Sequence, residues 1–166
     1  MKKDSLPDIE TMLERVHKPG RYIGCEWNSV HKDWSKAKVK VALCYPDLYE
    51  IGMSNLGVHI LYGIINQIPY ALAERIYAPA QDWESLLREK GTPLFSMESK
   101  MPVHYFDIVG FSLQTELSFT NVLNILHLSH IPLQAKDRQE NDPMILGGGP
   151  CTANPEPLAD FFDAFI

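Results

Sequence analysis

The sequence has 166 residues, of which 45% are hydrophobic and 22% are charged, and its formal net charge is −6. These proportions are typical of one globular domain with an ordinary core, and they exclude a disordered tail and a collagen-like chain. No apolar run reaches the roughly 18 residues that cross a bilayer, and the N-terminus lacks the apolar centre of a signal peptide. We therefore expect a cytoplasmic protein without a membrane segment.

The charge is distributed unevenly along the chain. Residues 1–40 hold nine Lys or Arg and six Asp or Glu, a balance of +3. Residues 41–166 hold six basic and fifteen acidic side chains, a balance of −9. Because the neutralisation of phosphates needs a basic surface, the acidic main body predicts that nucleic acid is not a partner.

The first predicted element is a short helix over residues 5–17, whose apolar side chains fall on one face. Pro19–Gly20 ends this helix. Residues 21–38 have no clear period, and we expect them to wrap around the main body. The sequence thus predicts an N-terminal helix and wrapping segment, residues 1–38, followed by an α/β domain, residues 39–166.

Strands and helices alternate from residue 39 onward. Apolar runs predict strands at 39–45, 74–79, 107–113, 144–149 and 161–166, and helical spacing predicts helices at 55–68, 81–91 and 116–130. The strands are apolar on both faces, which is typical of a sheet that is covered on both sides. The alternation predicts right-handed crossovers and parallel strands. We expect an α/β fold with a five-stranded, doubly wound, flavodoxin-like parallel sheet of order 2-1-3-4-5.

Ligands of such a sheet bind at the carboxyl ends of the strands, where three segments are candidates. They are residues 47–55 after the first strand, 112–116 after the third and 147–151 after the fourth. Each segment taken singly is also typical of an ordinary strand-to-helix turn. Glycines let a ligand approach the backbone, and hydroxyls and amides supply hydrogen bonds. We expect the segments to form one cavity, with these cofactor-binding residues: Asp47, Tyr49, Gly52, Ser54, Ser112, Thr115, Gly147, Gly148 and Gly149.

Several common motifs are absent from the sequence. It has no GxGxxG after the first strand and no GxxxxGK[ST], the two fingerprints of dinucleotide and ATP sites. Cys25, Cys44 and Cys151 are too widely spaced for a CxxC site, and no CxxxCxxC occurs. No pairing of a nucleophile with a base is evident. We therefore predict no catalytic residue and no metal ligand in this chain.

Residues 47–52 have the frame D-x-H-x-x-G, with Tyr49 at the histidine position. Together with Ser112–Leu113 and the run of glycines, this frame resembles a cobalamin-binding domain. Over about residues 18–166 the chain is similar to the N-terminal part of B12-binding-domain-containing radical SAM proteins. The stretches that carry this resemblance are KPGRYIG (18–24), YPDLYEIGMSNLG (45–57), GFSLQTEL (110–117), TNVLNILHLSHIPL (120–133) and GGGPCTANPEPLADFFDAF (147–165).

The resemblance implies cobalamin as the cofactor of this domain. It also implies a partner in the same polypeptide, a C-terminal barrel domain that carries CxxxCxxC, a [4Fe–4S] cluster and S-adenosylmethionine. Because the chain ends in an apolar strand, we expect a fragment that stops before this barrel. A phenol has a pKa of about 10 and is mostly protonated at neutral pH, so Tyr49 is a poor cobalt ligand. Cobalamin bound without this ligand and a fold that has lost the cofactor both remain open.

The leading hypothesis is a non-catalytic, cobalamin-binding-like module of a radical SAM protein, which binds a corrinoid or docks on the barrel. The radical reaction itself needs the barrel, so the chain alone is not expected to perform it. One alternative is a flavodoxin-like module for a flavin or a nucleotide, although no hydroxyl-rich phosphate loop follows the first strand. Another alternative is a purely structural interaction domain.

Overall fold

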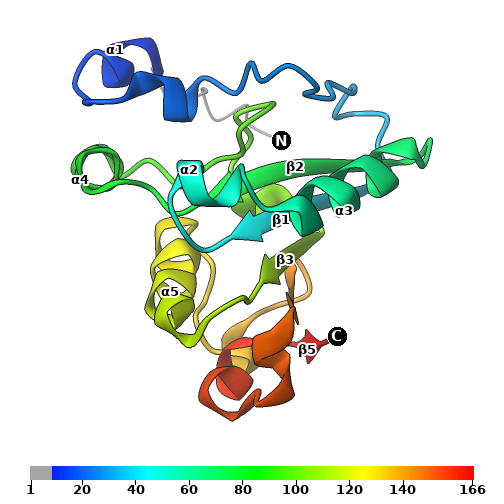
Figure 1. Ribbon diagram of the computed structural model, residues 1–166. Coiled ribbons are helices and arrows are strands. Elements are labelled where there is room, and N and C mark those ends of the chain that lie inside the picture. Colours follow the sequence, from blue (N-terminus) through cyan, green and yellow to red (C-terminus); the bar gives the residue numbers. More distant parts are fainter. Residues whose placement is uncertain (1–8) are drawn as a thin grey trace.

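Five parallel strands form the sheet of the computed structural model, which describes residues 9–166 (Figure 1). Their order is β2-β1-β3-β4-β5, so the predicted α/β class and strand order are confirmed. The strands are β1 Val39–Tyr45, β2 Ala71–Tyr77, β3 Ile108–Ser112, β4 Met144–Gly148 and β5 Ala164–Phe165.

Five α-helices accompany the sheet in the described part of the chain. They are α1 Ile9–Leu13, α2 Tyr49–Gly52, α3 Leu56–Gln67, α4 Gln81–Lys90 and α5 Phe119–Leu128. Helix α3 begins where the Asn55 side chain accepts a hydrogen bond from the Val58 N–H. Helix α4 ends at Gly91, whose φ of 61° is the left-handed conformation that glycine adopts readily. None of these helices has both the length and the apolar character that a bilayer crossing requires.

Several element boundaries differ from the predictions. Strand β2 begins at Ala71, three residues before the predicted start, because the parallel register pairs Val39 with Ala71. The predicted strand 161–166 is reduced to Ala164–Phe165, and the 3₁₀ helix Glu156–Phe161 precedes it. The predicted helix 116–130 is the 3₁₀ helix Glu116–Ser118 followed by α5. The predicted N-terminal helix 5–17 is shorter in the structure, where α1 ends at Leu13 and the 3₁₀ helix Pro19–Tyr22 follows; its residues 5–8 lie outside the described part.

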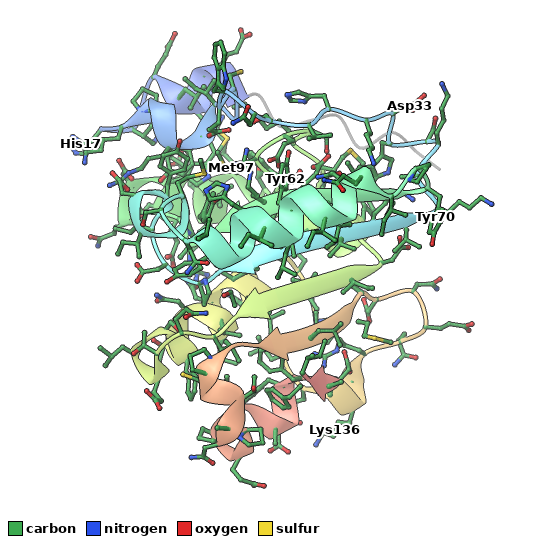
Figure 2. The ribbon with its side chains drawn as sticks, turned by 45° about the vertical axis from the view of Figure 1, so that its right-hand side comes forward. His17, Asp33, Tyr62, Tyr70, Met97 and Lys136 are labelled. Carbon is green, nitrogen blue, oxygen red and sulfur yellow. The ribbon has the colours of Figure 1, made fainter. Side chains whose placement is uncertain are left out.

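The sheet separates two apolar clusters of different size. On one face, α4, α5 and the segment before β5 pack a large core that includes Trp83, Phe111 and Ile125. On the other face, α3 packs a smaller cluster around Leu43 and Tyr62. Helix α3 contacts β1 and β2, and Figure 2 shows it lying over that half of the sheet. The predicted cover on both faces is therefore present over β1 and β2, whereas no helix of residues 9–166 covers the α3 side of β3 to β5.

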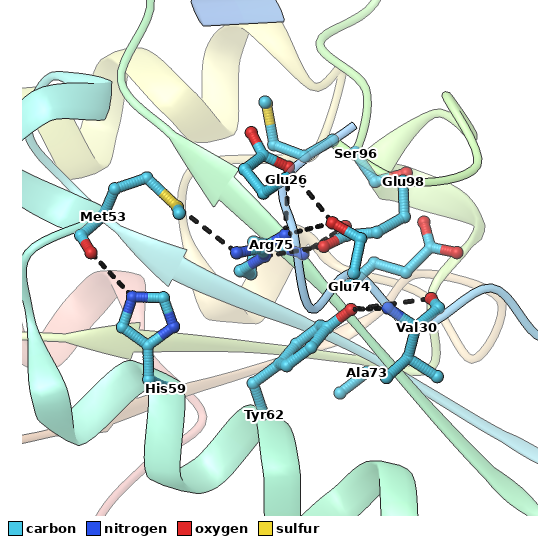
Figure 3. Close-up of polar contacts among 12 residues, drawn as sticks. Glu26, Val30, Met53, His59, Tyr62, Ala73, Glu74, Arg75, Ser96 and Glu98 are labelled. Carbon is cyan, nitrogen blue, oxygen red and sulfur yellow. Dashed lines mark hydrogen bonds and ion pairs between the residues drawn. The ribbon is translucent and has the colours of Figure 1, made fainter. Parts of the chain in front are cut away.

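Buried Arg75 of β2 holds the N-terminal segment against the sheet (Figure 3). Its Nε donates to Glu98 Oε1 at 2.6 Å, and its backbone N–H donates to Oε2 of the same carboxylate at 2.9 Å. Its Nη2 donates to Glu26 at 3.2 Å and to Ser29 at 2.9 Å. The guanidinium also lies 4.7 Å from the ring centroid of Tyr62, in α3. Burial raises the pKa of Glu98, and the charge of Arg75 opposes that rise.

Lys100 attaches the same segment at a second place. Its backbone has a φ of 60°, and its Nζ donates to the carbonyls of Tyr22, Ile23 and Met97 at 2.8, 2.8 and 2.6 Å. Burial lowers the pKa of this amine. Buried Arg75 and half-buried Lys100 thus bind residues 22–29 to the α/β domain, and the division at residue 38 stays a prediction.

We expect Arg75→Ala to lower the free energy of unfolding by about 3–5 kcal/mol, because the buried Glu98 carboxylate would lose its partner. The matched control is Arg15→Ala, which removes an exposed ion pair with Glu89 and is expected to cost far less. Urea denaturation followed by circular dichroism measures both. Equal losses in the two variants would contradict a special role for the buried pair.

Candidate functional site

The parallel pairing brings the ends of β1, β3 and β4 to one edge of the sheet (Figure 1). Across this edge, the Leu113 N–H donates to the Gly148 carbonyl at 2.7 Å, and the Cys151 N–H donates to the Leu113 carbonyl at 3.2 Å. The Asn121 side chain of α5 donates to the Pro46 carbonyl at 2.9 Å. The three predicted segments therefore lie at the same carboxyl edge.

A groove of about 450 Å³ runs from this edge along the sheet, beside α3. Four of the nine predicted residues line it: Ser112, Gly147, Gly148 and Gly149. The other five lie outside its lining: Asp47, Tyr49, Gly52, Ser54 and Thr115. The lining is apolar side chains and glycines with a few polar groups, and it includes no acidic, basic or imidazole side chain.

The surroundings of a side chain differ at the three consecutive glycines, Gly147, Gly148 and Gly149. A Cβ at Gly147 would lie 2.7 Å from the Phe165 ring, so Phe165 leaves no space for a side chain at this position. Gly149 has a φ of 114°, and a Cβ there would lie 2.7 Å from the Leu113 carbonyl oxygen. At Gly148 no heavy atom lies within 4 Å of a Cβ position, so this glycine leaves open space on the groove.

Tyr49 lies against β2 and outside the groove. Its ring meets the ring of Tyr77 edge to face, with centroids 5.6 Å apart. Burial raises the pKa of the Tyr49 phenol, and the nearby Glu26 carboxylate adds to this rise. Gly52 lies against the same Tyr77 ring and has no space for a Cβ. The segment after β1 therefore turns these two residues toward β2.

Asp47, Ser54 and Thr115 form hydrogen bonds within their own turns. The Asp47 carboxylate accepts from the next backbone N–H at 2.7 Å, and the Ser54 hydroxyl donates to the Ile51 carbonyl at 2.7 Å. The Thr115 hydroxyl accepts from the Leu117 N–H at 3.4 Å. These side chains shape the edge, and their predicted role in cofactor binding stays a prediction.

Glu50 attaches α2 to the N-terminal segment. Its carboxylate accepts from Arg21 Nη2 at 2.8 Å and from Lys18 Nζ at 3.2 Å. The Arg21 hydrogen bond lowers the pKa of Glu50 to about 2. This acid is therefore ionised at neutral pH, and its ion pairs hold α2 to the N-terminal segment.

The sequence prediction missed the contribution of α3 to the groove. Gly57, Val58, Leu61 and Ile65 of this helix line one wall. Apolar residues that extend around the helix beyond its sheet-facing side are a signal that could have indicated this second contact surface.

The described residues offer few ligands for the metals that the resemblance implies. Within residues 9–166, no group of three or more His, Cys, Asp or Glu is placed to hold a metal ion. Cys25 is exposed, Cys44 is buried and Cys151 is partly buried, each on a different part of the chain. This arrangement does not fit a [4Fe–4S] cluster. The groove has no imidazole or carboxylate, and burial raises the pKa of the one thiol in its lining, Cys44, so the groove supplies no strong side-chain ligand to cobalt. It offers an organic ring apolar surface and glycine backbone.

Comparison with known proteins relates this architecture to a family. A family model described as "Radical SAM proteins, N-terminal" matches residues 57–166, from α3 through β5. An uncharacterized protein of Methanocaldococcus jannaschii is 27% identical over 129 residues, which are 76% of this chain and 23% of that protein. The chain therefore corresponds to about a quarter of the length of this curated relative. No solved structure matches the chain.

We expect Gly147→Ala to lower the free energy of unfolding by about 1–3 kcal/mol, because the added methyl group overpacks against Phe165. Gly148→Ala is the adjacent control and is expected to change it by no more than about 1 kcal/mol, because its methyl group enters open space. Thermal unfolding of the two variants measures this difference. Equal destabilisation would contradict the assignment of the open space to Gly148.

Proposed function

The chain belongs to the family of radical SAM proteins, N-terminal, and we propose that it is a non-catalytic module that docks on the catalytic domain of the same polypeptide. The docking surface is the carboxyl edge of the sheet. The observation that carries the proposal is the exposure of apolar side chains there: Leu117, after β3, is 89% exposed, and Leu56, at the start of α3, is 70% exposed.

Both leucines belong to capped helical turns. Asn55 caps α3 next to Leu56, and the Thr115 hydroxyl accepts from the N–H of Leu117 itself. Because β1 and β3 are neighbours, the turns that follow them lie along the same edge. Single exposed apolar side chains are ordinary on a surface, whereas exposed apolar side chains on neighbouring turns are suited to an interface.

The composition of the chain indicates what this partner contributes. The sequence has no CxxxCxxC, and its described residues do not fit an iron–sulfur cluster. In the proposed arrangement, the [4Fe–4S] cluster and S-adenosylmethionine belong to the catalytic domain. The length of the relative, of which the matched region is 23%, supports a polypeptide with room for that domain.

We expect Leu117→Asp in the full-length protein to weaken docking by about 1–3 kcal/mol, because a charge replaces an apolar contact in the interface. Calorimetry should then show the N-terminal module unfolding separately and at lower temperature. The control is Tyr70→Asp, which alters an apolar side chain, 56% exposed, next to the start of β2 at the opposite edge. Identical unfolding profiles for the two variants would exclude the proposed docking edge.

A corrinoid held at the same edge is a second candidate function. The glycine backbone at 147–149 and the open space at Gly148 favour the approach of a flat organic ring. Tyr49 lies against Tyr77 and outside the groove, so it is not among the residues that would hold the corrinoid. When bound, a corrinoid supplies cobalt-centred chemistry, and the residues of this chain would hold and orient it.

We expect the full-length protein, incubated with hydroxocobalamin, to retain a corrinoid spectrum through gel filtration. Ser112→Phe should reduce the retained corrinoid at least about tenfold, because the larger ring fills the groove where it reaches the edge. Tyr49→Phe should leave both the amount and the spectrum unchanged. Loss of all corrinoid from the unmodified protein would remove this candidate, and flavin fluorescence in the purified protein would favour the flavodoxin-like alternative.

A further inference from the structure

The groove beside α3 lies over β3 and β4, on the face of the sheet opposite the large core. Ile108, Gly110 and Ser112 of β3, with Leu146 and Gly148 of β4, line the groove and are partly exposed. Their neighbours along the strands, such as Val109 and Ile145, are buried in the large core on the opposite face. These strands are apolar on both sides, which is typical of parallel strands that have helices on both faces.

Helix α3 presents a second apolar side to this groove. Val58 and Tyr62 are buried against the sheet, whereas Leu61 lines the groove and is 49% exposed. Ile64, one turn after Leu61, continues the apolar surface toward the solvent. A helix that contacts one layer has one apolar stripe, so this wider apolar surface indicates a second neighbour.

The course of the chain leads into the groove. The Ile166 N–H donates to the Gly147 carbonyl at 2.8 Å, so the backbone still follows β4 at the last residue. The Ile166 side chain is 83% exposed and lines the groove. The opposite face of β4 and β5 is already filled by Leu158 and Phe162. Among the described residues, the uncovered apolar surface that Ile166 meets is therefore the groove.

We propose that the groove is the seat of an amphipathic helix, formed by the segment of the same polypeptide that follows Ile166. This helix lies beside α3 and across β3 and β4, with its apolar side chains over Gly110 and Gly148. This helix covers a face of the sheet, whereas the proposed docking uses its carboxyl edge. Both require a longer polypeptide, which the length of the M. jannaschii relative supports.

Topology and shape favour a helix as the occupant. A strand that runs parallel to its neighbour is normally followed by a helix that packs back on the sheet with a right-handed connection. The connection from β1 to β2 has placed α3 on this face, and a helix that returns from β5 over β4 and β3 has the same sense. Glycines in the floor of the groove leave open space for its side chains, because Gly148 has no heavy atom near its Cβ position.

The experiment uses the full-length protein with a cysteine at one of two adjacent positions of α3. Leu61→Cys lies in the groove, and Ile60→Cys is the matched control, since Ile60 is 51% exposed and does not line the groove. Maleimide labelling is followed by peptide mass mapping, which separates these sites from the native cysteines. We expect Leu61→Cys to react at least about tenfold more slowly than Ile60→Cys, because the covering helix must open first. Equal rates would show an open groove and overturn the inference.

A photo-reactive benzoylphenylalanine at position 61 identifies the occupant. The expected product joins position 61 to a peptide beyond residue 166 of the same molecule. A cross-linked dimer would indicate a second copy, and protection without a cross-link beyond residue 166 would indicate a ligand or another segment; either result overturns the inference. Thermal unfolding of each variant confirms that it is folded. Docking can fail its own Leu117 test while position 61 remains protected, so the two proposals are distinguishable.

Discussion

The parallel pairing of β1, β3 and β4 is the constraint on which the rest of the structure depends. Parallel strands require every connection to return to the starting edge, so all the turns that carry candidate residues meet at the carboxyl edge. The right-handed sense of these connections also decides which face each helix covers. The chain moves across the sheet in one direction from β1 to β2 and in the other direction from β2 to β5, and this reversal places α3 on the face opposite α4 and α5.

The order of the strands could be predicted from the sequence because the relevant signals are local. Runs such as VKVALCY at 39–45 are apolar over the length of a strand, and helical spacing separates them. The start of β2 was harder to locate, since the Ala71-Leu72-Ala73 run is not β-branched and its strand conformation comes from pairing with β1. The two-residue β5 and the 3₁₀ helix before it also depend on tertiary packing, through Leu158 and Phe162.

In the candidate site too, local sequence features could be predicted, whereas contacts between distant parts of the chain could not. The glycine run at 147–149 is visible in the sequence, and its position after β4 follows from the alternation of elements. The orientation of Tyr49 depends on Tyr77, which is 28 positions later in the chain and approaches through β2. Spacing within the D-x-Y-x-x-G frame contains no information about that contact, so the frame alone could not predict that Tyr49 lies outside the groove.

The buried charges explain why the N-terminal segment and the α/β domain form one unit on the β2 side. A buried arginine loses hydration, and Arg75 offsets this loss with ion pairs to Glu98 and Glu26 and with contacts to Ser29 and the Tyr62 ring. These partners come from the N-terminal segment, from α3 and from the chain after α4, so the guanidinium is satisfied only when all three are in place. Buried polar contacts of Arg75 thus fix the segments around β2. Over β3 and β4, the face beside α3 instead presents apolar surface that a further element of the polypeptide can cover.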